Sequence, residues 1–288
     1  MHFSQILAFL ILVNFQCKPS VQKVENELFP ANYNLNDFQK ISLQDKMKEI
    51  SGLEWVGKEQ LLAIEDESSI IYSLAPETGK ILDQQKFAKN NDIEDIAWVN
   101  NVAWVLQSNG TLYEVTSPLT KNAKTTKHDF PIEKKRDLEA IVVSENGAYL
   151  YVFCKSCIWD NGAEEASVYR FDLASKQYDS VSFTTLKRES IQKCLTNNDK
   201  DPLEIEPAAA ALHPIEKQFY VLSSTGKWML ITDLNFKSKE IYRLNPKIFK
   251  QPEGITFDPA GNMYISNEGR GGEPNVLVFP YHRIPTNP

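Results

Sequence analysis

The chain has 288 residues, of which 42% are hydrophobic and 24% charged, so it can bury a packed core and disorder is not expected. Its net charge of -7 offers no basic face for nucleic acid or for anionic lipid, so neither is expected as a partner through surface charge. Short runs rich in valine, isoleucine, threonine and aromatic residues recur along the chain and favour β-strands.

The N-terminal segment has the pattern of a bacterial export signal. An apolar run over residues 6–13 is too short to span a bilayer as a helix, but it suits the core of a signal peptide. Cys17 follows this run at the place of the acylated cysteine of a lipoprotein. We therefore expect a lipoprotein-type signal peptide over residues 1–17, a flexible tether over residues 18–36 and one domain over residues 37–288. Lipid on Cys17 would be the protein's link to the membrane, and ordinary secretion with cleavage nearby is the alternative.

One motif recurs along the rest of the chain. In five segments, an apolar residue or a proline precedes a position that is most often glutamate, then a small or turn residue and an apolar strand. The positions in question are Ser51, Glu94, Glu139, Ala208 and Glu253, which lie 43, 45, 69 and 45 residues apart. A period of about 40–45 residues is that of a four-stranded propeller blade.

The strands within the repeats predict an all-β propeller of about five four-stranded blades. The fifth repeat stops after three strands, so we expect the strand over residues 38–43 to pair beside residues 276–279 and complete the last blade. The longest spacing contains a polar stretch over residues 186–205. This stretch is either an insertion in a blade or a degraded sixth blade, and six blades are therefore the alternative.

Three segments together resemble the SdiA-regulated family of bacterial exported proteins. The first covers residues 62–67, the second residues 137–141, and the third residues 251–258 together with residues 261–268. The likeness extends from about residue 49 to residue 279. The resemblance implies a β-propeller at the bacterial cell envelope and, as a further expectation, a calcium ion. It implies no particular activity.

Carboxylates at the repeated position are the candidate metal ligands. Glu94, Glu139 and Glu253 precede innermost strands, and equivalent positions of a propeller converge near its axis. Carboxylates brought together repel unless a cation or protons intervene, and Ca²⁺ prefers such oxygen ligands. Asp66 and Glu268 follow second strands and are further candidates at the same mouth. The alternative is that these side chains bond backbone amides at the rim of the channel.

The cysteines predict a structural disulfide. Cys154 and Cys157 close a strand, which is not the strand-to-helix setting of a thioredoxin-like pair. In an exported protein a disulfide is the ordinary outcome. Cys194 lies in the polar inserted stretch, which needs an anchor, so we expect it to bond Cys157 or, second, Cys154. A bond between Cys154 and Cys157 and free thiols are the alternatives.

These patterns favour a binding module for a small ligand or an envelope protein. The alternative is a metal-dependent hydrolase, of lactonase or phosphoesterase type, that uses the same acidic site. Trp55, Trp98 and Trp104 lie in strand patterns and are expected in the core.

Overall fold

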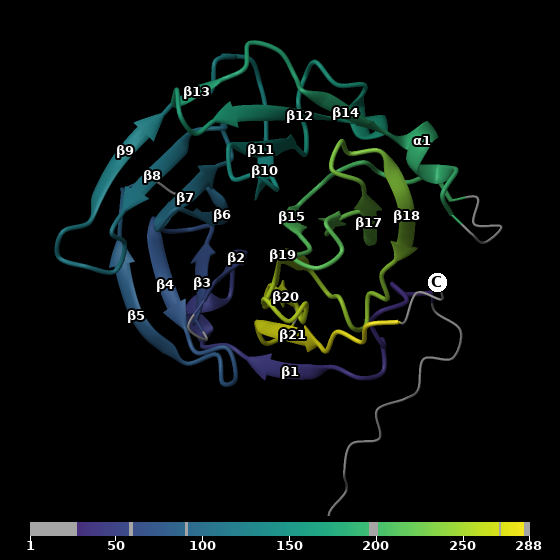
Figure 1. The fold of residues 1–288 in the computed structure, drawn as a ribbon, viewed down its shortest axis with the longest axis horizontal. Coiled ribbons are helices and arrows are strands. Elements are labelled where there is room, and N and C mark those ends of the chain that lie inside the picture. The colour runs from purple at the N-terminus through teal and green to yellow at the C-terminus, as the bar shows by residue number, and fades with distance from the viewer. Residues whose placement is uncertain (1–27, 58–59, 90–91, 196–200, 271, 285–288) are drawn as a thin grey trace, which may run out of the picture.

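The computed structural model describes residues 28–57, 60–89, 92–195, 201–270 and 272–284, and its regular elements are almost all β-strands. Five antiparallel sheets surround a central axis, as Figure 1 shows in a view along that axis. The predicted five-bladed propeller is confirmed, and the six-bladed alternative is wrong. The expected signal peptide, with Cys17, lies outside the described residues.

Each blade is a sheet whose first strand lines the channel. The first blade contains β2 (Ile50–Gly57), β3 (Gln60–Glu65), β4 (Ile70–Leu74) and β5 (Ile81–Lys86). The second contains β6 (Ile93–Val99), β7 (Val102–Gln107), β8 (Leu112–Thr116) and β9 (Lys124–His128). The fourth contains β15 (Ala209–Leu212), β16 (Phe219–Ser223), β17 (Trp228–Thr232) and β18 (Ser238–Arg243).

The third blade carries the insertion that lengthens the repeat. Its strands are β10 (Leu138–Val143), β11 (Tyr149–Cys154) and β12 (Glu165–Asp172), and β12 pairs with both β13 (Gln177–Tyr178) and β14 (Thr184–Lys187). The short helix α1 (Arg188–Gln192) follows β14 and lies beside β18 at the outer edge in Figure 1. Two short 3-10 turns, Asp45–Met47 and Gly162–Glu164, complete the regular elements.

The fifth blade joins the two ends of the described chain. Its strands are β19 (Pro252–Phe257), β20 (Met263–Asn267), β21 (Asn275–Phe279) and β1 (Gln39–Ser42), and β1 pairs antiparallel with β21 from Gln39 opposite Val278 to Ser42 opposite Asn275. Figure 1 shows the purple β1 along the yellow β21. This pairing confirms the predicted closure. It covers two sheet edges that would otherwise remain open.

The core is divided among the spaces between neighbouring blades. Five apolar clusters occur, one between each pair of adjacent sheets, such as the cluster of Ile64, Ile96 and Val105 between blades one and two. Inner strands are therefore buried on both faces, and β3 and β16 read as nearly unbroken apolar runs. The outermost strands meet solvent, and β9 (Lys124–His128) is accordingly polar.

The domain begins earlier than the sequence predicts. Tyr33 and Leu35 fall in the expected tether, but both are buried against the cluster between blades four and five. The Tyr33 hydroxyl donates a hydrogen bond to the Gly261 carbonyl at 2.6 Å. Residues 28–36 are thus part of the packed domain. Within the described part of the chain, no helix is long and apolar enough to cross a membrane.

Candidate functional site

The repeated motif position coincides with a β-bulge. In four blades the pairing ladder skips one residue of the innermost strand, and the skipped residues are Ser51, Glu94, Glu139 and Glu253. A bulged residue has no residue of its own opposite it, and the bulge redirects its side chain. The bulge therefore explains how a glutamate within an otherwise apolar strand reaches the mouth of the channel.

The five candidate ligands converge at that mouth. Glu94 is electrostatically coupled to Glu139 and to Asp66, Glu139 to Glu253, and Glu268 to both Glu253 and Asp66. These couplings form a closed ring of five carboxyl groups from blades one, two, three and five. We call this set the acidic ring. The assignment of these residues as metal ligands stays a prediction.

Burial sets the charge state of the acidic ring. It raises the pKa of Glu94 to about 9 and the pKa of Glu139 to about 8, with repulsion from neighbouring carboxylates adding to the effect. Burial likewise raises the pKa of Glu268 to about 8 and that of Asp66 to about 6. In the absence of a bound cation, Glu94, Glu139 and Glu268 are mostly protonated at neutral pH.

Two basic side chains contact the acidic ring. Lys155 follows the second strand of its blade, as Asp66 and Glu268 do in theirs, and its Nζ lies 2.5 Å from Glu139 Oε1. Arg270 is mostly exposed, and its Nε lies 3.3 Å from Glu268 Oε2. Neither residue is among the candidates that the sequence predicts. The signal for Lys155 was its place in the repeat, which becomes visible once the second strands are aligned.

Glu49 adds a sixth carboxyl group beside Asp66 and Glu268. It raises the pKa of both residues by repulsion, and its Oε2 lies 3.5 Å from Arg270 Nε. It was also missed, because it lies just before the repeated motif, where the other blades have Asp92, Asp137, Glu206 and Gln251, and only positions within the motif were compared.

The acidic ring has an unsatisfied side. Asp66 Oδ1 and Glu268 Oε2 are buried and accept no hydrogen bond from the described residues. Arg270 lies near Glu268 Oε2 but does not have hydrogen-bond geometry. Buried polar atoms are normally paired. Two unsatisfied carboxylate oxygens from adjacent blades, with Glu49 close by, fit the oxygen ligand set of a hard divalent cation. On the opposite side, Lys155 already satisfies Glu139.

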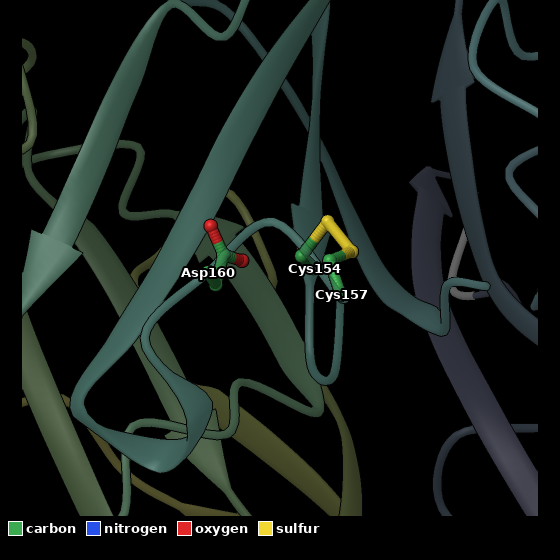
Figure 2. Close-up of side chains that lie close together, drawn as sticks. All are labelled: Cys154, Cys157 and Asp160. Carbon is green, nitrogen blue, oxygen red and sulfur yellow. A yellow bond between two sulfur atoms is a disulfide. The ribbon is translucent and has the colours of Figure 1, made fainter. Parts of the chain in front are cut away.

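The acidic ring is wider than a preformed metal cage. In the described ranges, one group of three acidic, histidine or cysteine side chains places its ligand atoms within 4.8 Å of one another, and it is Cys154, Cys157 and Asp160. Figure 2 shows that both sulfur atoms of this group are joined in a disulfide. They are therefore unavailable as thiolate ligands. A cation at the acidic ring would require the carboxylates to move together or water to complete its shell.

The expected disulfide between Cys194 and Cys157 is wrong. Cys154 bonds Cys157, and Cys194 is a free thiol. The reason lies in the two faces of the third blade: Cys154 and Cys157 pack in the cluster toward blade two, whereas Cys194 packs on the cluster toward blade four. The sheet of the third blade separates the two sites. The inserted stretch is instead held through Ile191 and Leu203, which are both buried.

Comparisons with known proteins support the fold. No protein-family model and no curated protein matches the chain. Glutaminyl cyclase from Myxococcus xanthus superimposes with a TM-score of 0.56 at 9% identity, over 86% of this chain and 96% of that chain. A Bacteroides thetaiotaomicron protein of unknown function gives 0.51 at 13%, over 76% and 52% of the two chains. Virginiamycin B lyase from Staphylococcus aureus gives 0.45 at 12%, over 87% and 75%. At these identities the glutaminyl cyclase likeness is one of fold alone, and the chain shares its β-propeller architecture.

Proposed function

We propose that this propeller is a ligand-binding module of the bacterial cell envelope and that its binding face is the acidic ring, where Asp66 and Glu268 hold Ca²⁺. The observation that carries the proposal is the pair of buried carboxylate oxygens, Asp66 Oδ1 and Glu268 Oε2, that accept no hydrogen bond from the described residues. A divalent cation satisfies such oxygens and removes the repulsion that raises the pKa values around them.

The chemistry of the acidic ring favours Ca²⁺ over zinc. All the candidate ligands are carboxylate oxygens, which calcium takes in numbers of six to eight, whereas zinc prefers nitrogen and sulfur. Asp66, Glu268 and Glu49 would be the ligands from this chain, with Glu94 and Glu253 next to them. The remaining positions of so large a shell are open to oxygen atoms of a small ligand or of an envelope protein.

The envelope assignment rests on the N-terminal sequence and on the motif resemblance. The apolar run over residues 6–13 followed by Cys17 supports export with lipid attachment. The order of the motifs supports a relation to the SdiA-regulated family. Mass spectrometry of the protein isolated from its native membrane should find lipid on Cys17, and a Cys17→Ala variant that fractionates unchanged with the membrane would refute the anchor.

Calcium titration tests the site directly. Isothermal calorimetry and thermal unfolding are compared in calcium and in chelator for the wild type, Asp66→Asn and Glu268→Gln. If free calcium exceeds the dissociation constant a hundredfold, linkage gives about 2.7 kcal/mol, which corresponds to a rise in Tm of about 5–10 °C. Both variants should lose the rise. Glu77→Gln, an exposed carboxylate away from the acidic ring, is the charge-matched control. Coincident curves in calcium and chelator would rule out the cation site.

A metal-dependent hydrolase is the second candidate, and one observation favours it. Burial and repulsion from neighbouring carboxylates raise the pKa of Glu94 to about 9 despite the opposing charge of Lys155, so it holds a proton at neutral pH as a general acid does. Turnover of lactones and of phosphate esters, measured with and without calcium, tests this candidate. Loss of turnover in Glu94→Gln with calcium affinity unchanged would support the enzyme, and absence of turnover in the wild type would exclude it for these substrates.

A further inference from the structure

The opposite mouth of the channel contains a cavity of about 220 Å³. Its walls come from the later residues of the five innermost strands, which begin at the acidic ring and end here. Most residues of the lining are apolar, with Ile141, Ala210 and Phe257 among them, and the surface that they share with polar side chains and backbone is mixed in character. Cavities of this composition, with a few convergent polar groups, are typical of small-molecule sites.

Two acidic residues line this cavity, Glu145 at the exposed rim and the more buried Glu54 in the wall. Glu54 Oε2 accepts a hydrogen bond from the Thr256 hydroxyl at 3.2 Å, and the backbone of Trp98 donates a second. None of the described lysine, arginine or histidine residues forms an ion pair with it. Burial raises the pKa of Glu54 to about 8. The two hydrogen bonds partly stabilise its carboxylate, and a bound cation would stabilise it further.

Two indole rings border the same space. Trp104 is buried in the core, as the sequence predicts. Trp55 and Trp98 pack against the apolar clusters between blades, also as predicted, but both are partly exposed and line the cavity as well. They lie near the ends of the innermost strands, where a ring can border both a neighbouring blade and the mouth of the channel. Trp55 also packs at a tilt against Tyr264, with ring centroids 5.4 Å apart, a contact that restricts its orientation. Indole faces attract cations.

We infer that this cavity is a second binding site, which takes a small organic cation of the alkylammonium class, with its charged group between Glu54 and the indoles of Trp55 and Trp98. A carboxylate and aromatic faces together recognise an ammonium group by charge and by cation–π attraction. The apolar remainder of the wall accommodates methyl or methylene groups. The cavity volume lies below the usual 300–1,000 Å³ of drug-sized sites, so the ligand is small.

Binding of the cation is coupled to release of a proton. In the free protein Glu54 is largely protonated at pH 7, and a bound ammonium group stabilises its carboxylate. The other titratable groups near it are Asp95 on β6, which is fully buried, and Glu145 at the rim. Asp95 accepts hydrogen bonds from the Ile96 and Ile141 amides, both at 2.8 Å, so it is held by the wall itself.

The test compares choline with its uncharged isostere, 3,3-dimethylbutan-1-ol, by calorimetry on the full chain. The indole fluorescence is a second readout. We expect choline to bind at least about tenfold more tightly, which is about 1.4 kcal/mol. Titrations in two buffers of different ionisation enthalpy should show that choline releases close to one proton at pH 7 and that the isostere releases none.

Variants separate this site from the acidic ring. Glu54→Gln should abolish the preference for choline, and Trp98→Leu should weaken choline binding several-fold. Glu189→Gln, which changes an exposed carboxylate on α1, and Glu268→Gln, at the other mouth, should leave it intact. Equal affinity for the two probes, an undiminished preference in Glu54→Gln, or no binding of choline at millimolar concentration would overturn the inference. The proton measurement uses the wild type, so it does not depend on how the variants fold.

Discussion

Replacement of Lys155 by methionine tests how much the positive charge of this lysine stabilises the carboxylates of the acidic ring. The ammonium group of Lys155 is the basic group in contact with Glu139, at 2.5 Å, and it lowers the pKa of both Glu139 and Glu94. Methionine keeps much of the volume of the side chain and removes its charge. The variant therefore leaves the carboxylates to repel one another without an internal counter-charge.

The size of the effect follows from the burial of the pair. Removing one partner of a fully buried ion pair costs about 3–5 kcal/mol. Since Lys155 is 25% exposed and Glu139 is 11% exposed, solvent screens part of the interaction. We expect a loss of about 2 kcal/mol, or about 4–8 °C in Tm for a domain of this size.

The loss should depend on pH with a defined sign. The pKa of Glu139 is about 8 even with Lys155 present, so the pair is fully charged only above that value. Near pH 6 the carboxyl group is protonated in both proteins, and the variant should be almost as stable as the wild type. Near pH 9 the carboxylate must be accommodated without its partner, and the full loss appears.

Thermal unfolding followed by circular dichroism in chelator, at about pH 6 and pH 9, measures the difference. Adding Glu139→Gln to Lys155→Met should restore most of the stability at high pH, because it removes the uncompensated carboxylate. Lys193→Met, an exposed lysine paired with Glu189, is the control and should behave as the wild type. Equal losses at both pH values would refute the reasoning.

Three further predictions concern the whole domain. In chelator, the free energy of unfolding of the wild type should fall between about pH 5 and pH 9, because Glu94, Glu139 and Glu268 keep protons in the folded state that the unfolded chain releases near its ordinary pKa of 4.5. Urea titrations at several pH values measure this slope, and a rise with pH would contradict it. Non-reducing peptide mapping should recover Cys154 linked to Cys157 and Cys194 alkylated, and reducing so short a loop should cost about 2 kcal/mol in the chain-entropy model; a bridge to Cys194 is the opposite result. Ile41→Pro should disrupt the pairing of β1 with β21 by about 3 kcal/mol or more and expose a sheet edge, which is seen as a lower Tm and as aggregation in light scattering; an unchanged Tm would mean that the closure contributes little.

Repetition is what made the fold and part of the site predictable from the sequence. Once a motif recurs at the spacing of a blade, rotation about one axis places Glu94, Glu139 and Glu253 together without any knowledge of side-chain contacts. Asp66 and Glu268 followed from the same reasoning, applied to the ends of second strands. Local patterns sufficed because each blade is built from contacts between nearby strands.

Features that depend on the two faces of a blade escaped prediction. Sequence spacing does not show on which side of a sheet a cysteine packs. Cys194 was therefore predicted to bond a cysteine that lies on the opposite face of the blade. The strand patterns placed Trp55 and Trp98 correctly against the core, but they did not show that the same rings also line a cavity. Lys155 was considered only as part of the Cys154–Cys157 motif, although its position in the blade matters more for the site.

The closure of the fifth blade has a consequence for when the chain can fold. β1 leaves the ribosome before every other strand of the propeller, and β21, with which it pairs, leaves last. Blades one to four are made of strands that are close in sequence and can form as they appear, but the ring cannot be completed until synthesis has passed Phe279. Until then the partners of β1 and β19 are missing, and an incomplete ring has exposed edges that bind chaperones or other chains. The last step of folding, pairing of β1 with β21, therefore waits until the end of the ring has been synthesised, whatever the order in which the blades form.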